Sequence, residues 1–215
     1  VDSYIRDSVI AGLLEDRKMQ IRIGQRFSVD ALNSERSEIT SFLQDRGYFR
    51  FHKEYITYKA RRHDEDKQVD VKLIVHPYYT AEGKDTLHAH YDIRNIEYES
   101  GAPNDSVIHL RRHVLEENTF IEKGKPYSAS ALQNTYNHFG RLGAVRYTNI
   151  NFEPVPDMSL LDTRIQIQTN KLSTISFQPE GTNTAGDFGA AASLTYQNRN
   201  LFKGAETFSV QLRGA

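Results

Sequence analysis

A nine-residue pattern that occurs twice constrains the fold of this chain more than any other feature. The pattern is a glycine, two variable residues, an aromatic residue, a serine, two variable residues, an alanine and a leucine, and it covers residues 24–32 and 124–132. In each copy the serine is a suitable helix N-cap, because its hydroxyl can accept a hydrogen bond from a free N–H of the first turn. A supersecondary unit that recurs in this way indicates two tandem modules.

Each copy of the pattern is followed by apolar residues at helical spacing, which predicts an amphipathic helix. The expected core residues of these two helices are Leu32, Ile39, Leu43, Leu132, Tyr136 and Phe139. Gly47 ends the first helix and Gly143 ends the second, since glycine accepts the left-handed conformation that a helix end often needs. A further helix is predicted ahead of each, within residues 1–17 and within residues 107–117.

Two strands are predicted after each of these helix-ending glycines. In the first copy they cover residues 49–58 and 69–75, with a densely charged hairpin loop between them. In the second copy they cover residues 145–152 and 163–169, and a strand at residues 89–99 precedes the helices. The second module therefore has the order β-α-α-β-β. The first shows only α-α-β-β, and we expect its opening strand to be lost by truncation.

Residues 172–215 have a different pattern, in which apolar and polar residues alternate. Periodicity alone fits two strands of a soluble sheet equally well. However, the apolar run has about the ~9–11 residues that a tilted membrane strand needs, and the opposite face is small and mostly uncharged. The residues expected to face lipid are Phe188, Ala190, Ala192, Leu194, Tyr196, Phe208, Val210 and Leu212. Those expected on the polar side are Thr195, Gln197, Ser209 and Gln211.

Residues 181–208 resemble the start of the barrel in the BamA/TamA family of outer-membrane assembly factors. The specific part runs from Tyr196 to Glu206, as aromatic-x-Asn-x-Asn-Leu-Phe-x-Gly-Ala-Glu. This phrase fixes a run of unlike residue types rather than one repeated residue. The resemblance implies that the first barrel strand lies at about residues 173–180 and takes part in client insertion.

The repeated unit resembles the polypeptide-transport-associated (POTRA) domain, which in this family directly precedes the barrel. The matching residues of the first copy are Gly24, Phe27, Ser28, Leu32, Ile39, Leu43, Gly47, Tyr48 and Phe49. Those of the second copy are Gly124, Tyr127, Ser128, Leu132, Tyr136, Phe139 and Gly143. The second copy departs from the family at Ala144, where an aromatic residue usually follows the glycine.

The predicted fold class is therefore α+β, with tandem β-α-α-β-β POTRA modules followed by the start of an antiparallel transmembrane β-barrel. We expect a POTRA-like module at residues 1–77, a linker at 78–87, a second module at 88–171 and the first barrel strands at 172–215. The chain starts without a methionine and ends inside a strand pattern. We therefore expect it to be the middle of a longer protein.

Composition and motifs exclude several classes of function. The chain has no cysteine and a net charge of -1, so it has neither thiolate chemistry nor an overall basic character for nucleic acid. His109, His113 and Glu117 have the spacing of metal ligands on a helix, but the glutamate that activates water beside the first histidine is absent. No nucleophile elbow, phosphate loop or dinucleotide fingerprint occurs. We expect no catalytic residue, no cofactor and no metal.

The remaining candidate for binding is the protein backbone. A small module cannot hide both edges of its sheet, and an open edge can bind an extended client as an added strand. The expected edge residues are Phe49, Phe51, Tyr55, Val145, Tyr147 and Asn149.

The resemblance implies assembly or insertion of outer-membrane proteins, with residues 1–171 in the periplasm of a Gram-negative-type cell. The implied partners are unfolded outer-membrane proteins, outer-membrane lipid and accessory periplasmic or lipoprotein subunits, with no nucleic acid. A secretion pore of the two-partner type is an alternative that the sequence does not separate from this one. Two further alternatives are an enzyme fused upstream and a freestanding soluble binding protein.

Overall fold

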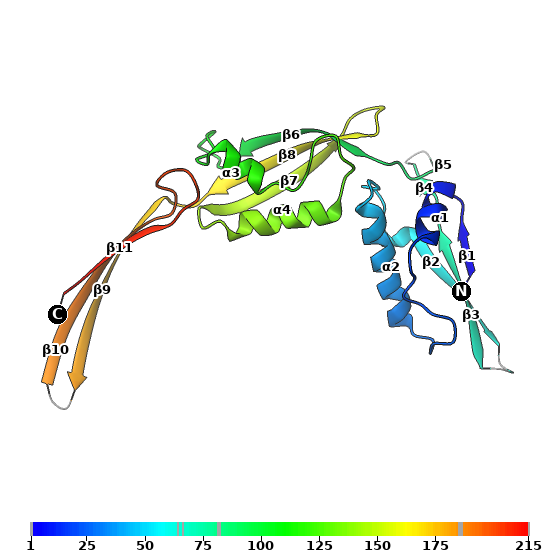
Figure 1. Ribbon diagram of the computed structural model, residues 1–215, viewed down its shortest axis with the longest axis horizontal. Coiled ribbons are helices and arrows are strands. Elements are labelled where there is room, and N and C mark those ends of the chain that lie inside the picture. The colour runs from blue at the N-terminus through cyan, green and yellow to red at the C-terminus, as the bar shows by residue number, and fades with distance from the viewer. Residues whose placement is uncertain (1, 64, 66, 81–82, 185–186, 215) are drawn as a thin grey trace. The chain divides into compact units, whose positions relative to one another are not determined.

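The computed structural model of the chain describes residues 2–63, 65, 67–80, 83–184 and 187–214 (Figure 1). Within strands β9 and β10, the side chains of residues 182–184 and 187–188 are also outside the described part. The chain divides into two compact units. The first comprises Val1–Ile93, Gly124–Ala131 and Val155–Leu161, and the second comprises Arg94–Lys123, Leu132–Pro154 and Asp162–Ala215.

The first module consists of a short strand, two helices and two further strands. Its elements are β1 (Asp2–Ile5), α1 (Ser8–Glu15), α2 (Val29–Gln44), the 3-10 turn η1 (Lys53–Tyr55), β2 (Ile56–His63) and β3 (Gln68–Val75). In the sheet, of order β1-β3-β2, the central strand β3 is parallel to β1 and antiparallel to β2. The stretch predicted as a linker contains a small hairpin, made of β4 (Tyr78–Tyr79) and β5 (Asp85–Thr86).

Strand β1 shows that the prediction of a missing opening strand is wrong. Ile5, at the end of β1, pairs with Val75 of β3. The sequence concealed this strand because Ile5 lies at helical spacing from Val9, which suggested a single helix across residues 1–17. The helix begins only after Asp7, whose carboxylate accepts hydrogen bonds from two N–H groups of the first turn.

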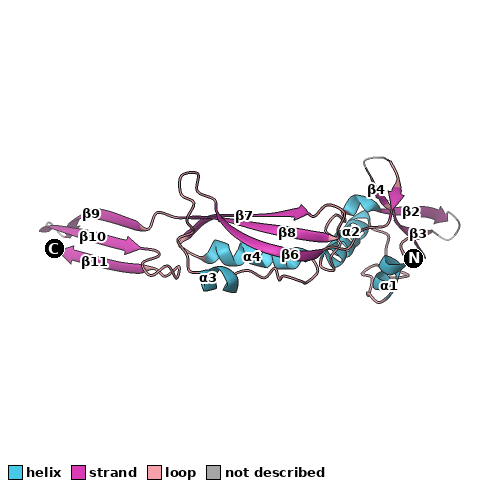
Figure 2. Ribbon diagram, turned by 90° about the horizontal axis from the view of Figure 1, so that it is seen from above, coloured by secondary structure: helices cyan, strands magenta, loops and turns pink. Residues whose placement is uncertain are grey.

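The second module repeats the order of the first. Its elements are β6 (Asp92–Ser100), α3 (Arg112–Glu117), α4 (Ala129–Arg141), β7 (Val145–Pro154) and β8 (Leu160–Thr169). The order β-α-α-β-β is thus confirmed, and the sheet order β6-β8-β7 corresponds to that of the first module. Both helices lie against one side of this sheet (Figures 1 and 2). Among the described helices, none is both long and apolar enough to cross a membrane.

The buried stripes of α2 and α4 differ in part from the predicted ones. Three expected core residues are almost completely buried, namely Ile39, Leu43 and Phe139. Three others are only half-buried, namely Leu32, Leu132 and Tyr136. The buried position nearest the start of each helix is polar, with Glu35 in α2 and Thr135 in α4. Compared with the predicted face, the buried face of each helix is therefore rotated about the helix axis towards its own polar residue.

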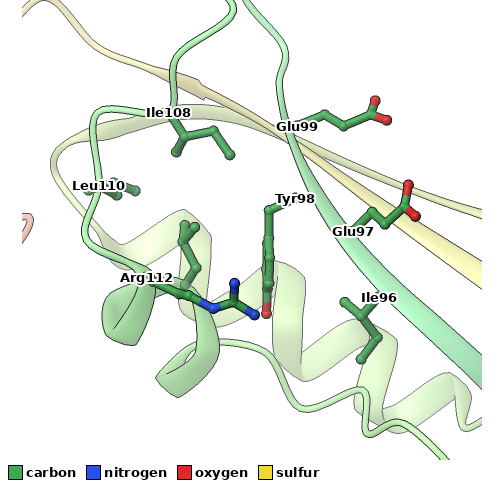
Figure 3. A pocket seen from close by; sticks show the side chains of 8 residues that line it. Ile96, Glu97, Tyr98, Glu99, Ile108, Leu110 and Arg112 are labelled. Carbon is green, nitrogen blue, oxygen red and sulfur yellow. The ribbon is translucent and has the colours of Figure 1, made fainter.

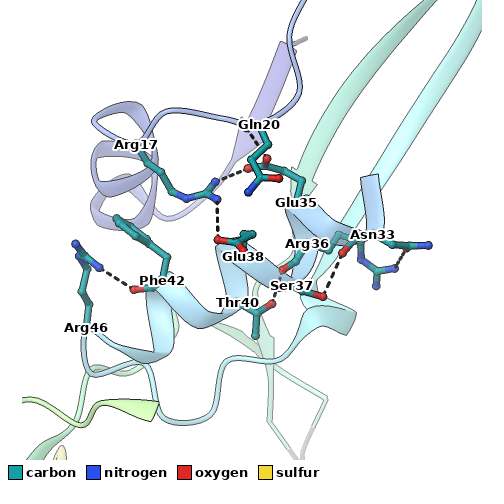
Figure 4. Close-up of polar contacts among 10 residues, drawn as sticks. All are labelled: Arg17, Gln20, Asn33, Glu35, Arg36, Ser37, Glu38, Thr40, Phe42 and Arg46. Carbon is teal, nitrogen blue, oxygen red and sulfur yellow. Dashed lines mark hydrogen bonds and ion pairs between the residues drawn. The ribbon is translucent and has the colours of Figure 1, made fainter. Parts of the chain in front are cut away.

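A set of polar contacts surrounds the buried Glu35 (Figure 4). Its carboxylate forms an ion pair with Arg17, and its Oε2 accepts a hydrogen bond from the backbone N–H of Gln20 at 2.7 Å. Arg17 also lies 3.9 Å from the carboxylate of Glu38. Burying a carboxylate is costly unless it is paired and hydrogen-bonded, and Glu35 is both. These contacts connect the segment after α1 to α2.

The last part of the chain is an open antiparallel sheet of three strands, ordered β11-β10-β9. The strands are β9 (Ser173–Thr184), β10 (Asp187–Asn198) and β11 (Phe208–Gly214). The expected first strand at residues 173–180 lies within β9. Within the described residues, β9 and β11 remain as open edges of this sheet, so the strands do not close into a barrel.

Candidate functional site

Strand β7 lies at an edge of the second module, and it contains three residues predicted to bind clients. Tyr147 is exposed, whereas Val145 is buried. Asn149 donates a hydrogen bond from its side-chain amide to Oε1 of Gln166 at 3.3 Å. These residues therefore lie on an edge strand, and the binding of a client to them remains a prediction.

The other three predicted edge residues are not on a strand. Phe49, Phe51 and Tyr55 all precede β2, which begins only at Ile56. Phe51 is 1% exposed in the core of the first module. The predicted edge strand at residues 49–58 is thus wrong for residues 49–55, whose aromatic side chains pack around a short 3-10 turn, whereas residues 56–58 lie in β2. The edge strand of the first module at this position is β2.

Phe49 and Tyr55 pack against other aromatic rings and do not lie on a free strand edge. The ring of Phe49 lies 5.0 Å from that of Tyr127 and 6.0 Å from that of Tyr91 in edge-to-face arrangements. The ring of Tyr55 lies 4.6 Å from that of His88. Aromatic pairs at these distances and angles are favourable beyond the area that they bury. These residues therefore act in packing.

Asp45, just after α2, accepts hydrogen bonds from the start of α4. Its carboxylate accepts from the Ser128 hydroxyl at 2.9 Å, the Ser130 N–H at 2.7 Å and the Ser130 hydroxyl at 2.6 Å. Partial burial by itself raises the pKa of Asp45, but the hydrogen bonds from Ser130 and Ser128 outweigh it and lower the pKa. The sequence pattern identified Ser128 as a cap but gave no sign of Asp45 as its partner.

Gly47 completes this contact between the end of α2 and the second copy of the repeated pattern. Its N–H donates to the Tyr127 carbonyl at 2.9 Å, and its own carbonyl accepts from the Tyr91 N–H at 2.8 Å. Gly47 has a φ of 91°, and a Cβ at this position would lie 2.5 Å from Nε2 of His90. Glycine is therefore required both by the conformation and by the close approach of the His90 ring.

The three-stranded sheet β11-β10-β9 has an exposed apolar face. Leu194 of β10 lies opposite Phe177 of β9 and Leu212 of β11. In the next row Tyr196 lies opposite Ile175 and Val210. All members of this apolar face are at least one-third exposed: Ile175, Phe177, Leu194, Tyr196, Val210 and Leu212. Contiguous exposed apolar surface of this kind marks an interaction or membrane site.

Two other predicted lipid-facing residues stand apart from these rows. Phe208 is exposed, and it pairs with Asn198 rather than with an apolar residue. Phe188 lies on β10, but its side chain is outside the described part of the structure. The contact of any of these residues with lipid remains a prediction.

The opposite face of the same sheet is polar. Thr195 lies opposite Ser176 and Gln211, and Gln197 lies opposite Thr174 and Ser209. An ion pair of 2.7 Å between Arg213 of β11 and Glu180 of β9 spans the central strand. The register therefore separates an apolar and a polar face across three strands rather than along one strand only.

The connection between β10 and β11 contains most of the phrase 196–206, and hydrogen bonds to its own side chains hold it in place. Asn200 is 4% exposed, and its Oδ1 accepts a hydrogen bond from the Ala205 N–H at 3.0 Å. The carboxylate of Glu206 accepts from the N–H groups of Phe202 and Gly204. These hydrogen bonds lower the pKa of Glu206, and the bond from Phe202 has the largest effect.

The same connection is hydrogen-bonded to the segment before α3. The side-chain amide of Asn200 donates to the carbonyl of His109. The N–H of Arg111 donates to the carbonyl of Lys203 at 2.9 Å. The asparagine and the turn that identify the phrase in the sequence therefore attach the strand pair to the second module. Sequence reasoning identified the phrase but not this role.

The histidines that have metal-ligand spacing are not brought together. Helix α3 begins only at Arg112, so His109 lies before it and the predicted start of the helix at residue 107 is wrong. Nε2 of His109 lies 2.6 Å from Oδ2 of Asp105, in a pair that closes a turn. Among the described residues, no cluster of three potential metal ligands occurs.

Comparison with known proteins agrees with this architecture. The POTRA family model, described as a surface antigen variable number repeat, matches residues 2–77. Residues 2–77 are therefore similar to a POTRA domain, and the second module has the same element and sheet order. None of the curated proteins matches the chain.

Two solved structures share the fold over almost the whole chain. The structure of BamA from Haemophilus ducreyi lacking POTRA domains 1–3 has a TM-score of 0.69 and 17% identity, over 98% of this chain and 36% of that one. CdiB from Acinetobacter baumannii has a TM-score of 0.50 and 9% identity, over 99% of this chain and 37% of that one. The chain thus spans little more than a third of either protein, and at these identities the likeness is one of fold.

Proposed function

We propose that the chain belongs to an outer-membrane protein that inserts or assembles other β-barrel proteins. In this proposal the two modules lie in the periplasm and hold extended client segments at their sheet edges, while β9, β10 and β11 enter the outer membrane. The partners are then unfolded outer-membrane proteins, outer-membrane lipid and accessory periplasmic or lipoprotein subunits. No catalytic step is needed, because strand addition uses backbone hydrogen bonds.

The observation that carries this proposal is the exposed apolar face of the sheet β11-β10-β9. Leu194, Phe177 and Leu212 form a row across all three strands, and each is more than 40% exposed. A membrane strand presents alternate residues to lipid and the others to a polar interior. The polar face, with Thr195 and Gln211, agrees with the second requirement. The likeness of fold to BamA supports the same interpretation.

A secretion pore of the two-partner type is the second candidate. It is supported by the fold, because by resemblance the same superfamily also uses modules of this kind ahead of a barrel for secretion. The likeness of fold to CdiB extends over 99% of this chain, as far as the likeness to BamA does, and so does not favour one candidate. Both candidates require the same apolar face and differ in the client.

Depletion of the full-length protein from its own bacterium distinguishes the two candidates. An assembly factor predicts that many different barrel proteins disappear from the outer membrane together. A secretion pore predicts that one secreted protein disappears from the medium while the other barrel proteins remain. If the full-length protein is soluble without detergent, and its depletion changes neither the outer-membrane barrel proteins nor a secreted protein, both candidate functions are wrong.

A further inference from the structure

A groove of about 520 Å³ runs along β6 in the second module (Figure 3). It is lined by Ile96, Glu97, Tyr98, Glu99, Ile108, Leu110, Arg112 and Leu115. Four of these residues are consecutive in β6, at positions 96–99, which places the groove along the edge of the strand. The other wall is formed by the segment before α3 and by α3 itself. No residue that the sequence predicted to bind a client lies in this groove.

The backbone of β6 is unpaired on the groove side. β6 is an edge strand of its sheet. At the start of β6 this edge is already hydrogen-bonded to the segment before α4. The N–H of Ile93 donates to the Lys125 carbonyl at 2.9 Å, and the Ile93 carbonyl accepts from the N–H of Gly124 at 2.7 Å. Among the described residues, those at 95–99 make no backbone hydrogen bond to a segment outside the sheet. An exposed edge of this kind is a template for an added strand.

The two faces of β6 differ in chemical character along the groove. Ile96 and Tyr98 point into the groove, where Tyr98 donates to Oγ1 of Thr119 at 3.0 Å (Figure 3). Glu97 and Glu99 point to the other side of the strand. The carboxylate of Glu97 is exposed, and within the described residues its only hydrogen bond is from the Asn95 amide, at 3.0 Å.

The wall of the groove opposite β6 is fixed by hydrogen bonds with the connection between β10 and β11. Ile108 and Leu110 line the groove, whereas the intervening His109 carbonyl accepts a hydrogen bond from Asn200. The N–H of Arg111, the next residue, donates to Lys203. This wall is therefore preformed by the connection between β10 and β11. A preformed wall lowers the entropic cost of binding.

We propose that this groove binds a single extended peptide segment as an added strand on β6, with large apolar side chains alternating with basic ones. This proposal rests on the proposed function and specifies the client segment. Residues directly opposite each other on paired strands share a face. Apolar side chains opposite Ile96 and Tyr98 therefore enter the groove. A basic side chain opposite Glu97 meets an exposed carboxylate, and one opposite Glu99 meets a carboxylate that also lies 4.0 Å from Arg164.

The charges also argue against a second copy of this chain as the occupant. Antiparallel pairing of two β6 edges in this register would bring Glu97 and Glu99 of one copy opposite those of the other. Like charges directly opposite each other are destabilising. A client with lysine or arginine at these positions has no such conflict.

The test uses the 215-residue chain in detergent micelles and two fluorescein-labelled synthetic peptides. Each peptide alternates valine or phenylalanine with a charged residue, which is lysine in one peptide and glutamate in the other. Fluorescence anisotropy measures the two dissociation constants. We expect the lysine peptide to bind at least about fivefold more tightly, since opposite charges on paired strands attract and like charges repel.

Charge reversal at Glu97 locates the site. Glu97→Lys is expected to abolish or reverse the preference between the two peptides, whereas the control Glu122→Lys, on an exposed residue outside the groove, leaves it intact. Hydrogen exchange adds a second measurement, in which the amides of residues 95–99 slow down when the lysine peptide binds. An equal effect of both substitutions, or exchange that is unchanged at residues 95–99, would overturn the proposal.

Two further outcomes separate this proposal from the proposed function. If a substitution in β7 abolishes peptide binding while Glu97→Lys has no effect, the β6 site is wrong and client binding at an edge stands. If neither peptide binds but depletion of the full-length protein still removes many barrel proteins from the membrane, only the β6 site is wrong. Sedimentation that shows dimers strengthened by Glu97→Lys, which removes the repulsion between Glu97 and Glu99 of the two copies, would assign the groove to a second copy and also overturn the proposal.

Discussion

The carboxylate of Glu35 accepts a hydrogen bond from the backbone N–H of Gln20, and the same bond recurs 100 residues later between the hydroxyl of Thr135 and the N–H of Phe120. The two distances are 2.7 Å and 3.0 Å. In each module a buried polar side chain on the second helix thus fixes the segment that precedes the glycine of the repeated pattern. The first module uses a charged group for this bond and the second a neutral one.

Glu35→Ala should destabilise the first module by about 3–5 kcal/mol, because it leaves the mostly buried Arg17 with only the more distant, exposed Glu38 as a partner. Native-state hydrogen exchange of the α2 amides measures this change without requiring the whole chain to unfold in one step. Glu38→Ala is the matched control, since Glu38 is on the same helix and largely exposed. Comparable effects of the two substitutions would show that the buried pair is not important for stability.

Leu43→Ala should destabilise the first module by about 2–5 kcal/mol, because Leu43 is fully buried and its truncation leaves a cavity. Leu32→Ala should cost clearly less, because Leu32 is only half-buried on the same helix. Exchange of the α2 amides in the two variants gives the comparison. A loss below about half a kcal/mol for Leu43→Ala would show that this stripe is not in the core.

The amphipathic pattern predicted both helices but not the rotation of their buried faces. Leu32 and Leu132 fit the helical spacing as well as Ile39 does, and the spacing alone does not place a carboxylate inside. Glu35 is buried because Arg17 and Gln20, which are distant in sequence, meet it there. Such a contact depends on tertiary structure and leaves no periodic signal.

Other differences have similar physical causes. Phe49 and Phe51 alternate as in a strand, yet they turn inward to aromatic partners that the fold supplies. Ser28 and Ser128 were predictable as caps, because capping is a local interaction. The opposite faces of β10 were also predictable, since a strand alternates with a period of two. The groove along β6 was not, because its walls come from separate segments.

Asp45 should have a folded-state pKa below its ordinary value of 3.8, owing to the hydrogen bonds from Ser130 and Ser128. A lowered carboxyl pKa means that the contact contributes its full stability above the unfolded pKa, and loses it as the pH falls through the folded pKa. The contact is therefore complete above about pH 4 and weakens in more acidic solution. NMR titration of the side-chain carboxyl carbon measures this pKa.

Ser130→Ala should raise the pKa of Asp45, because one of the hydrogen bonds that lower it is removed while the effect of burial remains. Ser37→Ala, on the exposed side of α2, should leave the titration unchanged. If Asp45 titrates identically in all three proteins, the hydrogen bonds to the start of α4 do not form in solution.

Thr148→Pro should weaken the binding of an extended client to β7. The N–H of Ile150 donates to the Tyr136 hydroxyl of α4 at 3.0 Å, outside the sheet, as expected for an N–H on the free edge of β7. N–H groups two residues apart on a strand point the same way, so proline at position 148 removes an edge donor. Fluorescence anisotropy with a labelled extended peptide measures the affinity.

Thr148→Val keeps the N–H and serves as the control for Thr148→Pro. Circular dichroism should show that both variants are folded, because proline is tolerated on an edge strand where the N–H faces outward. Equal peptide affinity in the two variants would show that the β7 edge does not bind clients.

Leu194→Arg should block assembly of the full-length protein in a membrane, because an arginine facing lipid near the bilayer midplane costs about 2–4 kcal/mol. Thr195→Arg, one residue further along β10, should be tolerated because Thr195 lies on the polar face with Ser176 and Gln211. Heat-modifiable migration in gels measures barrel assembly. Equal impairment by both substitutions would contradict the assignment of the two faces.

The most direct test of the account measures lipid contact along β10 in the full-length protein. Nitroxide spin labels are placed singly at positions 189–197, and their collision rates with oxygen and with a polar nickel complex are compared in bilayers. We predict an alternation with a period of two, in which labels at 190, 192, 194 and 196 contact lipid and those between them contact water. Equal lipid contact at odd and even positions would show that this sheet does not cross the membrane as proposed.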